Sequence, residues 1–435
     1  MKFISIILKV YEKFSRYQKN IFFGFIRGHD YLSKKELYDL KNLVGKYNNE
    51  IERDFEDKFS KIIGNGSCIS YAAARMGLYE IMRYKKICHN DEVIILGSTC
   101  SVMINAIKRI GAIPIYSDID LNTLGSEVSS IKNKITNNTK MIIAQHSFGI
   151  PCNIKPIVKL AKEKNIFLLE DCALTIGSTI SGKKVGNFGD AAIFSTDHSK
   201  PINSLIGGLI YSRDLKLINN LRSLQKKLPS LSRAHQYLLW REFLFEKKYR
   251  NPYYEGQIAL LGTLINLKRK FLFQRSPYLV DDFSLKNQNN YPYPCKIPSF
   301  LAALGIIEIK RWSKIKDERK NNLEKLIFFF KNSQINILSS YENKELEIIP
   351  LRFVWLNEEN LIKEKDIKEF TDITSFWFKK PIIGIVGELK DYGYLEGMSP
   401  LSEKVNSKVM NLPCNINSKE FNVMEIKLNS LLKNC

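Results

Sequence analysis

Short apolar runs alternate with amphipathic stretches through the first half of the chain. Residues 91–120 read as a strand (D-E-V-I-I-L-G), a helix (S-V-M-I-N-A-I-K-R-I-G) and a second strand (A-I-P-I-Y-S-D-I-D). The same order recurs with K-M-I-I-A-Q-H at 140–146, P-I-V-K-L-A-K-E-K at 156–164 and N-I-F-L-L-E-D at 165–171. Continuously apolar strands that alternate with helices predict a mainly parallel sheet covered on both faces, and hence an α/β fold.

The pattern changes after residue 224. The next stretch is aromatic and basic, as in Y-L-L-W-R-E-F-L-F-E-K-K-Y-R at 237–250, and a long apolar helix starts near 297. The run I-I-P-L-R-F-V-W-L at 348–356 predicts a strand of a smaller domain. We therefore expect four parts: a basic amphipathic extension (1–45), a large domain (46–224), a helical basic and aromatic insertion (225–293) and a small α+β domain (294–435).

Two residues at the ends of predicted strands suggest a chemistry. Ligands of a parallel sheet bind beyond the carboxyl ends of its strands. Asp171 ends one apolar run, and Lys200 follows the next, with a glycine-rich hairpin between them. Burial lowers the pKa of a lysine and makes its amine a nucleophile. An acid and a lysine at one sheet edge suit pyridoxal phosphate, which needs a lysine to hold it and a carboxylate to keep its ring nitrogen protonated.

Longer motifs surround these two residues. They are H-S-F-G-I-P (146–151), L-L-E-D-C-A (168–173), G-K-K-V-G-N-F-G-D-A-A-I-F-S (182–195) and, near the C-terminus, M-S-P-L-S-E-K-V (398–405). Their order and spacing resemble those of the DegT/DnrJ/EryC1/StrS sugar aminotransferases, over roughly residues 60–225 and 294–435. The resemblance implies the fold type I of pyridoxal-phosphate-dependent transferases.

The same resemblance implies roles for single residues. Lys200 falls on the catalytic lysine that forms a Schiff base with the cofactor, and Asp171 falls on the partner of its ring nitrogen. Ser195 and the turn that contains Ala74 and Arg75 fall where the cofactor phosphate is held. A guanidinium at a helix N-terminus can hold phosphate by charge, although the family usually has a threonine at the place of Arg75.

Other positions depart from the family. Cys100 stands where an aromatic side chain usually stacks on the cofactor, and Leu174 replaces a common polar residue. Lys296 stands at an arginine that the neighbouring subunit of a homodimer usually supplies. By their own setting, His146 and Glu170 are predicted to make structural hydrogen bonds, while nothing in the sequence fixes the direction of His198.

These observations favour a pyridoxal-phosphate-dependent aminotransferase that makes an amino sugar on a nucleotide carrier, with glutamate as donor, for a surface polysaccharide or related glycan. A homodimer is implied by the resemblance. One alternative is a related, dehydratase-like reaction on a sugar or cyclic ketone. The other is a family member without activity that serves as a binding subunit.

Composition adds a question about partners. The 435 residues carry a formal net charge of +21, with eight cysteines in no C-x-x-C pair, so we expect reduced thiols and no metal site. The charge fits a lysine-rich proteome, an anionic substrate or an acidic membrane, and no motif predicts nucleic-acid binding. We expect a cytoplasmic protein. Apolar residues at helical spacing near the N-terminus (Ile4 to Phe14), and the insertion, fit either helices packed on the body or a basic surface on a membrane.

Overall fold

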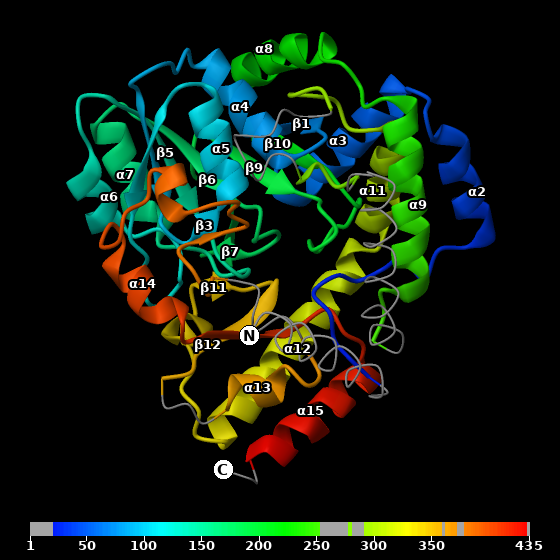
Figure 1. The fold of residues 1–435 in the computed structure, drawn as a ribbon, viewed down its shortest axis with the longest axis vertical. Helices are drawn as coiled ribbons and strands as arrows, with labels where there is room; N and C mark the ends of the chain where they lie inside the picture. The colour runs from blue at the N-terminus through cyan, green and yellow to red at the C-terminus, as the bar shows by residue number, and fades with distance from the viewer. Residues whose placement is uncertain (1–20, 253–276, 281–290, 359–361, 372–377, 433–435) are drawn as a thin grey trace, which may run out of the picture.

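A seven-stranded sheet crosses the larger part of the molecule in the computed structural model, which describes residues 21–252, 277–280, 291–358, 362–371 and 378–432 (Figure 1). Its strands, in spatial order, are β1 (Ser67–Tyr71), β10 (Gly208–Ser212), β9 (Ala191–Ser195), β6 (Phe167–Asp171), β5 (Thr139–Gln145), β2 (Glu92–Leu96) and β4 (Ile113–Ser117). β10 is antiparallel to both of its neighbours, and every pair from β9 to β4 is parallel. The mainly parallel sheet is therefore confirmed.

The apolar runs form strands because both faces of the sheet are buried. Successive residues of a strand point to opposite faces, and those of β2 divide accordingly. Ile94 packs with Ile157, while Val93 and Ile95 share the other cluster with Ile104. The helices of this part are α3 (Asn49–Ile63), α4 (Ala74–Tyr84), α5 (Ser101–Arg109), α6 (Val128–Lys134), α7 (Ile154–Glu163) and α8 (Leu215–Lys226).

The glycine-rich segment between β6 and β9 forms the predicted hairpin. Its strands are β7 (Thr179–Ile180) and β8 (Lys183–Lys184), which pair antiparallel. Ser181 and Gly182 form the turn, with φ of 49° and 79°. Positive φ at both central residues is what a tight hairpin turn demands, because its twist then matches that of the strands.

The C-terminal part has its own core below the sheet (Figure 1). The helix expected from 297 is two helices in sequence, α11 (Ser299–Lys310) and α12 (Trp312–Asn332), and the strand expected at 348–356 is shorter, β12 (Arg352–Leu356). Phe330, Phe353 and Trp355 pack against one another in this core. The remaining elements are β11 (Leu346–Glu347), α13 (Glu364–Ile367), α14 (Pro400–Asn406), β14 (Val409–Pro413), α15 (Ser418–Leu432) and the 3-10 helices η2 (Ser339–Glu342) and η4 (Leu389–Tyr392).

Hydrogen bonds join the C-terminal part to the large sheet. β13 (Ile382–Ile383) pairs in parallel with β3 (Thr99–Cys100), which leads into α5. The Asp118 carboxylate, just after β4, accepts from the backbone N–H groups of Leu401 (2.8 Å) and Ser402 (2.9 Å) at the start of α14. The segment between these two joints, residues 382–402, is thus held at both ends.

The extension and the insertion are both packed where they are described. Phe23 is buried in the core of the C-terminal part, and the short helix α2 (Lys34–Leu43) is capped by Ser33. In the insertion, α9 (Arg233–Tyr249) buries Leu239 and Phe243 in the main core. The predicted apolar spacing from Ile4 to Phe14 and residues 253–276 and 281–290 of the insertion lie outside the described residues. Within the described ranges, no helix combines the length and the apolar character needed to cross a bilayer.

Candidate functional site

The carboxyl ends of β6 and β9 meet at one edge of the sheet, because these strands are parallel neighbours. Asp171 is the last residue of β6, and Lys200 lies in the loop that follows β9. A cavity of about 310 Å³ opens between them; we call it the first cavity. The predicted site residues in its wall are Ala74, Arg75, Cys100, Asp171, Ser195 and Lys200.

The Lys200 side chain is partly exposed, and its amine loses its proton more readily than that of a lysine in water. Its backbone N–H donates to the Asp197 carbonyl (2.9 Å), which closes a tight turn in the loop. Burial lowers the pKa of the Lys200 amine; Arg352 lowers it further, while the Asp197 carboxylate opposes the shift. A larger fraction of the amine is therefore uncharged at neutral pH than for a lysine in water, as a nucleophile or a base requires.

Asp171 is 4% exposed, and its Oδ1 accepts from the backbone N–H of Ala173 (2.9 Å). Burial raises the pKa of Asp171, while the Ala173 N–H and the nearby Lys200 and His146 lower it. A buried carboxylate is costly without a partner. A cationic group in the first cavity would supply that partner.

The start of α4 forms another part of the wall. Its first residue is Ala74, and the preceding Ala73 provides no side-chain cap. An uncapped helix N-terminus favours an anion, through its backbone N–H groups and the helix dipole. Gly208 is needed here, because a Cβ on it would lie 2.1 Å from the Ala74 nitrogen. The Gly-Gly pair after Lys200 thus allows β10 to lie directly against this helix start.

Arg75 also connects the first cavity to the insertion. Its guanidinium donates to the Leu279 carbonyl (3.0 Å), which also accepts from the Tyr291 hydroxyl (2.7 Å). Residues 278–280 lie in the cavity wall as a result. None of the site residues predicted from the sequence lies in the insertion, so this part of the wall is a new finding.

The remaining predicted residues differ in position. Cys100 lies at the N-terminus of α5 and Ser195 at the end of β9, both on the first cavity, where Ser195 Oγ accepts from the Asp197 N–H (3.4 Å). Lys296 is buried elsewhere, with its ammonium 4.6 Å from the centre of the Tyr47 ring. The structure therefore does not bring Lys296 to the cavity of its own chain.

His146 and Glu170 support the site from behind, as expected. His146 Nδ1 accepts from the Cys152 N–H (3.0 Å), so the proton is on Nε2, which donates to Glu170 (3.2 Å). The Glu170 carboxylate also accepts from the backbone N–H groups of Gly186, Phe188 and Gly189. These bonds fix the hairpin against β6.

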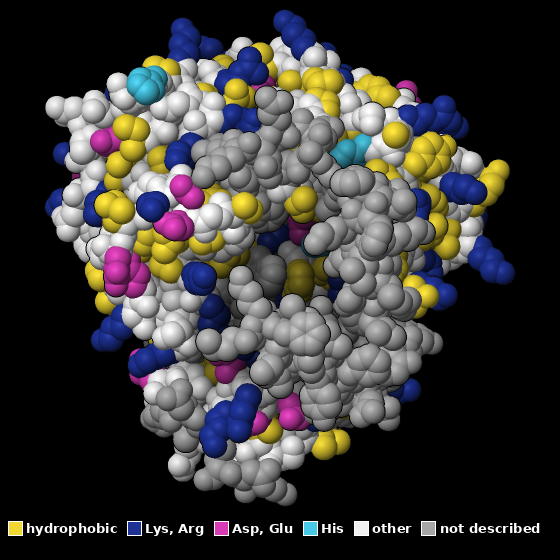
Figure 2. Space-filling view, viewed as in Figure 1, with side chains coloured by type: hydrophobic (Ala, Val, Ile, Leu, Met, Phe, Trp, Pro, Cys, Tyr) yellow, Lys and Arg dark blue, Asp and Glu magenta, His cyan; other side chains and the backbone are white. Residues whose placement is uncertain are grey.

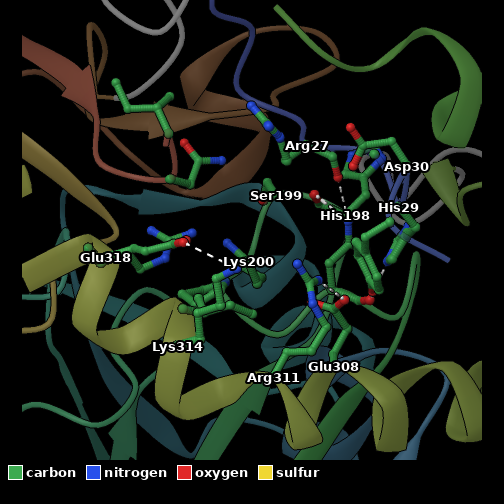
Figure 3. A pocket seen from close by; sticks show the side chains of 18 of the residues that line it. Arg27, His29, Asp30, His198, Ser199, Lys200, Glu308, Arg311, Lys314 and Glu318 are labelled. Atoms are coloured by element: carbon green, nitrogen blue, oxygen red, sulfur yellow. Dashed lines mark hydrogen bonds and ion pairs between the residues drawn. The ribbon is translucent and has the colours of Figure 1, made fainter. Parts of the chain in front are cut away.

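A second cavity, of about 210 Å³, also has Lys200 in its wall (Figure 3). Its wall carries cations that the sequence analysis missed, namely Arg27, Arg311, Lys314 and Arg319. Most of them are paired: Arg27 with Glu420, Arg311 with Glu308 and Lys314 with Glu318 (3.0, 3.0 and 3.8 Å). Arg319 is 4% exposed and donates to the Pro350 and Leu351 carbonyls, and burial lowers its pKa to about 10. Among the described residues it has no carboxylate within ion-pair distance.

His198 is a further residue that the sequence analysis left aside. It lines both cavities, and its Nδ1 lies 2.9 Å from Oε1 of Glu246 in α9. The expectation that nothing fixes its direction was wrong. One signal was present: Glu246 continues the apolar stripe of Leu239 and Phe243 along the helix, where a carboxylate must be buried.

Known proteins resemble this chain in part of its sequence and in its fold. Residues 41–241 match the model of the DegT/DnrJ/EryC1/StrS aminotransferase family. The chain is 36% identical over 204 residues to GDP-perosamine synthase of Escherichia coli O157:H7, covering 47% of this chain and 52% of that protein. It is 38% identical over 173 residues to dTDP-3-amino-3,6-dideoxy-alpha-D-galactopyranose transaminase of Aneurinibacillus thermoaerophilus, covering 40% and 48%. The chain thus spans about half the length of the curated relatives it matches.

The fold matches over a longer range. The putative sugar aminotransferase Spr1654 of Streptococcus pneumoniae, in its PLP form, superimposes with a TM-score of 0.70 and 17% identity, covering 96% of this chain and 99% of that one. The predicted fold class, type I of the pyridoxal-phosphate-dependent transferases, is thereby confirmed.

Proposed function

We propose, because residues 41–241 match the model of the DegT/DnrJ/EryC1/StrS aminotransferase family, that this protein is a pyridoxal-phosphate-dependent aminotransferase that converts a nucleotide-linked keto-sugar to an amino sugar. Glutamate is the proposed amino donor, and a surface polysaccharide or related glycan is the proposed destination of the product. The observation that carries the proposal is the placement of Lys200 and Asp171 in one cavity with an uncapped helix N-terminus.

The residues of the first cavity fit pyridoxal phosphate. Lys200 would hold it covalently, and the Asp171 carboxylate would keep its ring nitrogen protonated. The start of α4, together with Ser195, would bind its phosphate, since Gly208 leaves room for backbone to approach there. When bound, the cofactor supplies an electron sink for the carbon that gains or loses the amine.

Lys200 also has a role after the cofactor is held. Its amine has a lowered pKa, so it can accept a proton from the amine-bearing carbon of the donor. It can then return a proton to the sugar carbon that receives the amine. Because Lys200 lies in the wall of both cavities, its Nζ can serve substrates that enter from the side of the second cavity.

The second cavity supports anionic substrates. Arg319 and Lys314 in its wall attract carboxylate or phosphate groups, and glutamate and nucleotide sugars carry both kinds. On the face shown in Figure 2, Lys and Arg side chains are scattered over the surface rather than gathered in one patch. The local charge beside Lys200 is therefore a better argument for an anionic substrate than the overall charge.

The function is tested with purified protein, pyridoxal phosphate, glutamate and a panel of nucleotide keto-sugars. We expect an amino sugar and 2-oxoglutarate in equal amounts. A deoxygenated sugar that carries no new amine, with the nitrogen of glutamate released as ammonia, would favour the dehydratase-like alternative. Failure to bind the cofactor at all would favour the binding subunit without activity.

We also propose that the protein is a homodimer in the cytoplasm and that it rests on acidic membranes through α9. This helix exposes Tyr237, Leu238 and Leu244, with the exposed cations Arg241 and Lys248 beside them. Figure 2 shows apolar and basic side chains together along the right-hand edge, where Figure 1 places α2 and α9.

We expect the protein to sediment with anionic liposomes and not with neutral ones. Each cation near an acidic surface contributes about 1 kcal/mol, and apolar side chains add to this. The binding should weaken at high salt, because the attraction is screened within about 10 Å at 0.1 M. Equal recovery with both lipids, or none with either, would leave α9 as a helix that packs on the body or on a second subunit.

A further inference from the structure

The insertion reaches the loop that carries Lys200 through one buried cluster. His198, two positions before Lys200, lies beside it in the wall of the second cavity (Figure 3). Its Nδ1 is 2.9 Å from Oε1 of Glu246, and the Tyr278 hydroxyl donates to the same oxygen (2.5 Å). The Tyr278 ring lies 4.7 Å from the imidazole, centre to centre. Glu246 and Tyr278 both come from the insertion, so its packing determines how His198 is held.

The surroundings of His198 favour its cation. Glu246 has a side chain only 2% exposed, and the carboxylate of Asp197 lies 3.6 Å from Nε2 on the other side of the ring. Burial by itself would lower the pKa of His198, but Asp197 and Glu246 outweigh burial and Arg250, and the net shift is upward. Phe25 and Tyr278 cover the ring without adding charge. The two carboxylates therefore favour the imidazolium of His198 more than water does.

Asp197 is shared between two cations. It is the carboxylate that most strongly opposes the loss of charge on Lys200, ahead of Asp171. Its Oδ1 also accepts from the N–H and the hydroxyl of Ser199 (3.2 and 3.3 Å), so its place in the loop is fixed. The other groups that act on Lys200 are Arg352 and Cys100. The more strongly Asp197 is engaged by His198, the less it stabilises the Lys200 ammonium.

We infer that Glu246 is a positioning residue for Lys200: it holds His198 against the Asp197 carboxylate, which leaves that carboxylate less available to the Lys200 ammonium. The inference rests on the proposed function only for the chemical role of the Lys200 amine as nucleophile and base. The family match ends at residue 241, within the insertion, and Glu246 lies beyond it. The inference therefore gives this part of the insertion a role in the site.

The effect of removing the Glu246 charge has a defined sign. In Glu246→Gln, His198 loses one carboxylate partner and is neutral over more of the neutral pH range. Asp197 then no longer shares its charge with an imidazolium and stabilises only the Lys200 ammonium, so the pKa of Lys200 rises. The uncharged, reactive fraction of the Lys200 amine should fall at neutral pH and recover at higher pH, so the variant is rescued by alkali.

The test measures this amine without any activity. The full-length protein, freed of cofactor, is labelled with trace acetic anhydride across a pH series, and the Lys200 peptide is quantified by mass spectrometry. We expect the midpoint for Lys200 to rise by about half to one pH unit in Glu246→Gln. Glu242→Gln, on the same helix, is the matched control, because Glu242 is not among the groups that act on His198; its midpoint should be unchanged.

A double variant separates this pathway from a general loosening of the site. If Glu246 acts through His198, then Glu246→Gln should have no further effect in a His198→Gln background, because interacting residues are not additive. An unchanged midpoint in Glu246→Gln, or a shift that adds fully to that of His198→Gln, would overturn the inference. Failure of the aminotransferase assay with a shifted midpoint would instead count against the proposed function alone.

One measurement does not depend on the Glu246→Gln variant. The chain has five histidines, and the resonance of His198 can be assigned by its loss in His198→Gln. In the wild-type protein, we expect His198 to remain protonated above the ordinary pKa of a histidine, about 6.5. Deprotonation below that value would contradict the inference even if Glu246→Gln did not fold.

Discussion

Lys200→Ala is expected to abolish transamination and the visible absorbance of the bound cofactor, while the protein stays folded. One amine would both hold pyridoxal phosphate and carry the proton, so no other group of the first cavity can replace it. Loss of a general base alone costs a factor of about 10²–10⁴ in rate, and loss of the covalent attachment adds to this. The Lys200 side chain is only partly buried and lies in a loop, so we expect little change in the free energy of unfolding.

The measurement combines turnover, absorbance and borohydride trapping. In the wild type, borohydride should fix the cofactor to the peptide that contains Lys200. Lys226→Ala, at the exposed end of α8, is the control that removes a surface lysine and should behave as wild type. Ordinary turnover in Lys200→Ala, or trapping at a different lysine, would refute the assignment.

Asp171→Asn is expected to keep the cofactor and lose orders of magnitude in turnover. An amide cannot keep the ring nitrogen protonated, so the electron sink is lost while Lys200 and the phosphate contacts remain. The amide is nearly the same size as the carboxylate and can still accept from the Ala173 N–H, so the fold should persist. Cofactor affinity is measured by absorbance titration and turnover with glutamate, with Asp54→Asn on the surface of α3 as control. Near-normal turnover would mean that another acid protonates the ring.

The core of the site could be predicted because its parts are local in the sequence. Asp171 ends an apolar run, Lys200 follows another, and the rule that parallel strands end together brings the two to one edge. The hairpin between them was predicted from its glycines. The structural roles of His146 and Glu170 followed in the same way, since His146 comes directly after β5 and Glu170 is the residue before the end of β6.

The second cavity and the His198 cluster could not be predicted because their residues are distant in the chain. Arg27 lies near the N-terminus and Arg319 in α12, so they meet only after the two parts have packed. Glu246 reaches His198 across 48 positions, from a helix outside the resemblance. The spacing of apolar residues within one helix or strand does not predict contacts between residues so far apart in the chain. Lys296, at the position of an arginine from a neighbouring subunit, lies away from the cavity of its own chain, so its role stays a prediction.

The joints between the C-terminal part and the large sheet limit how the protein can move during turnover. β13 is paired to β3 next to the first cavity, and α14 is bonded to Asp118 after β4, so the segment 382–402 travels with the large sheet. A hinge rotation of the whole C-terminal part would have to break the backbone hydrogen bonds between β13 and β3 and the hydrogen bonds from α14 to the Asp118 carboxylate. We therefore expect motion at the candidate site to be local. Side chains around the second cavity would move to admit and release ligands, while the distance between the two cores stays the same.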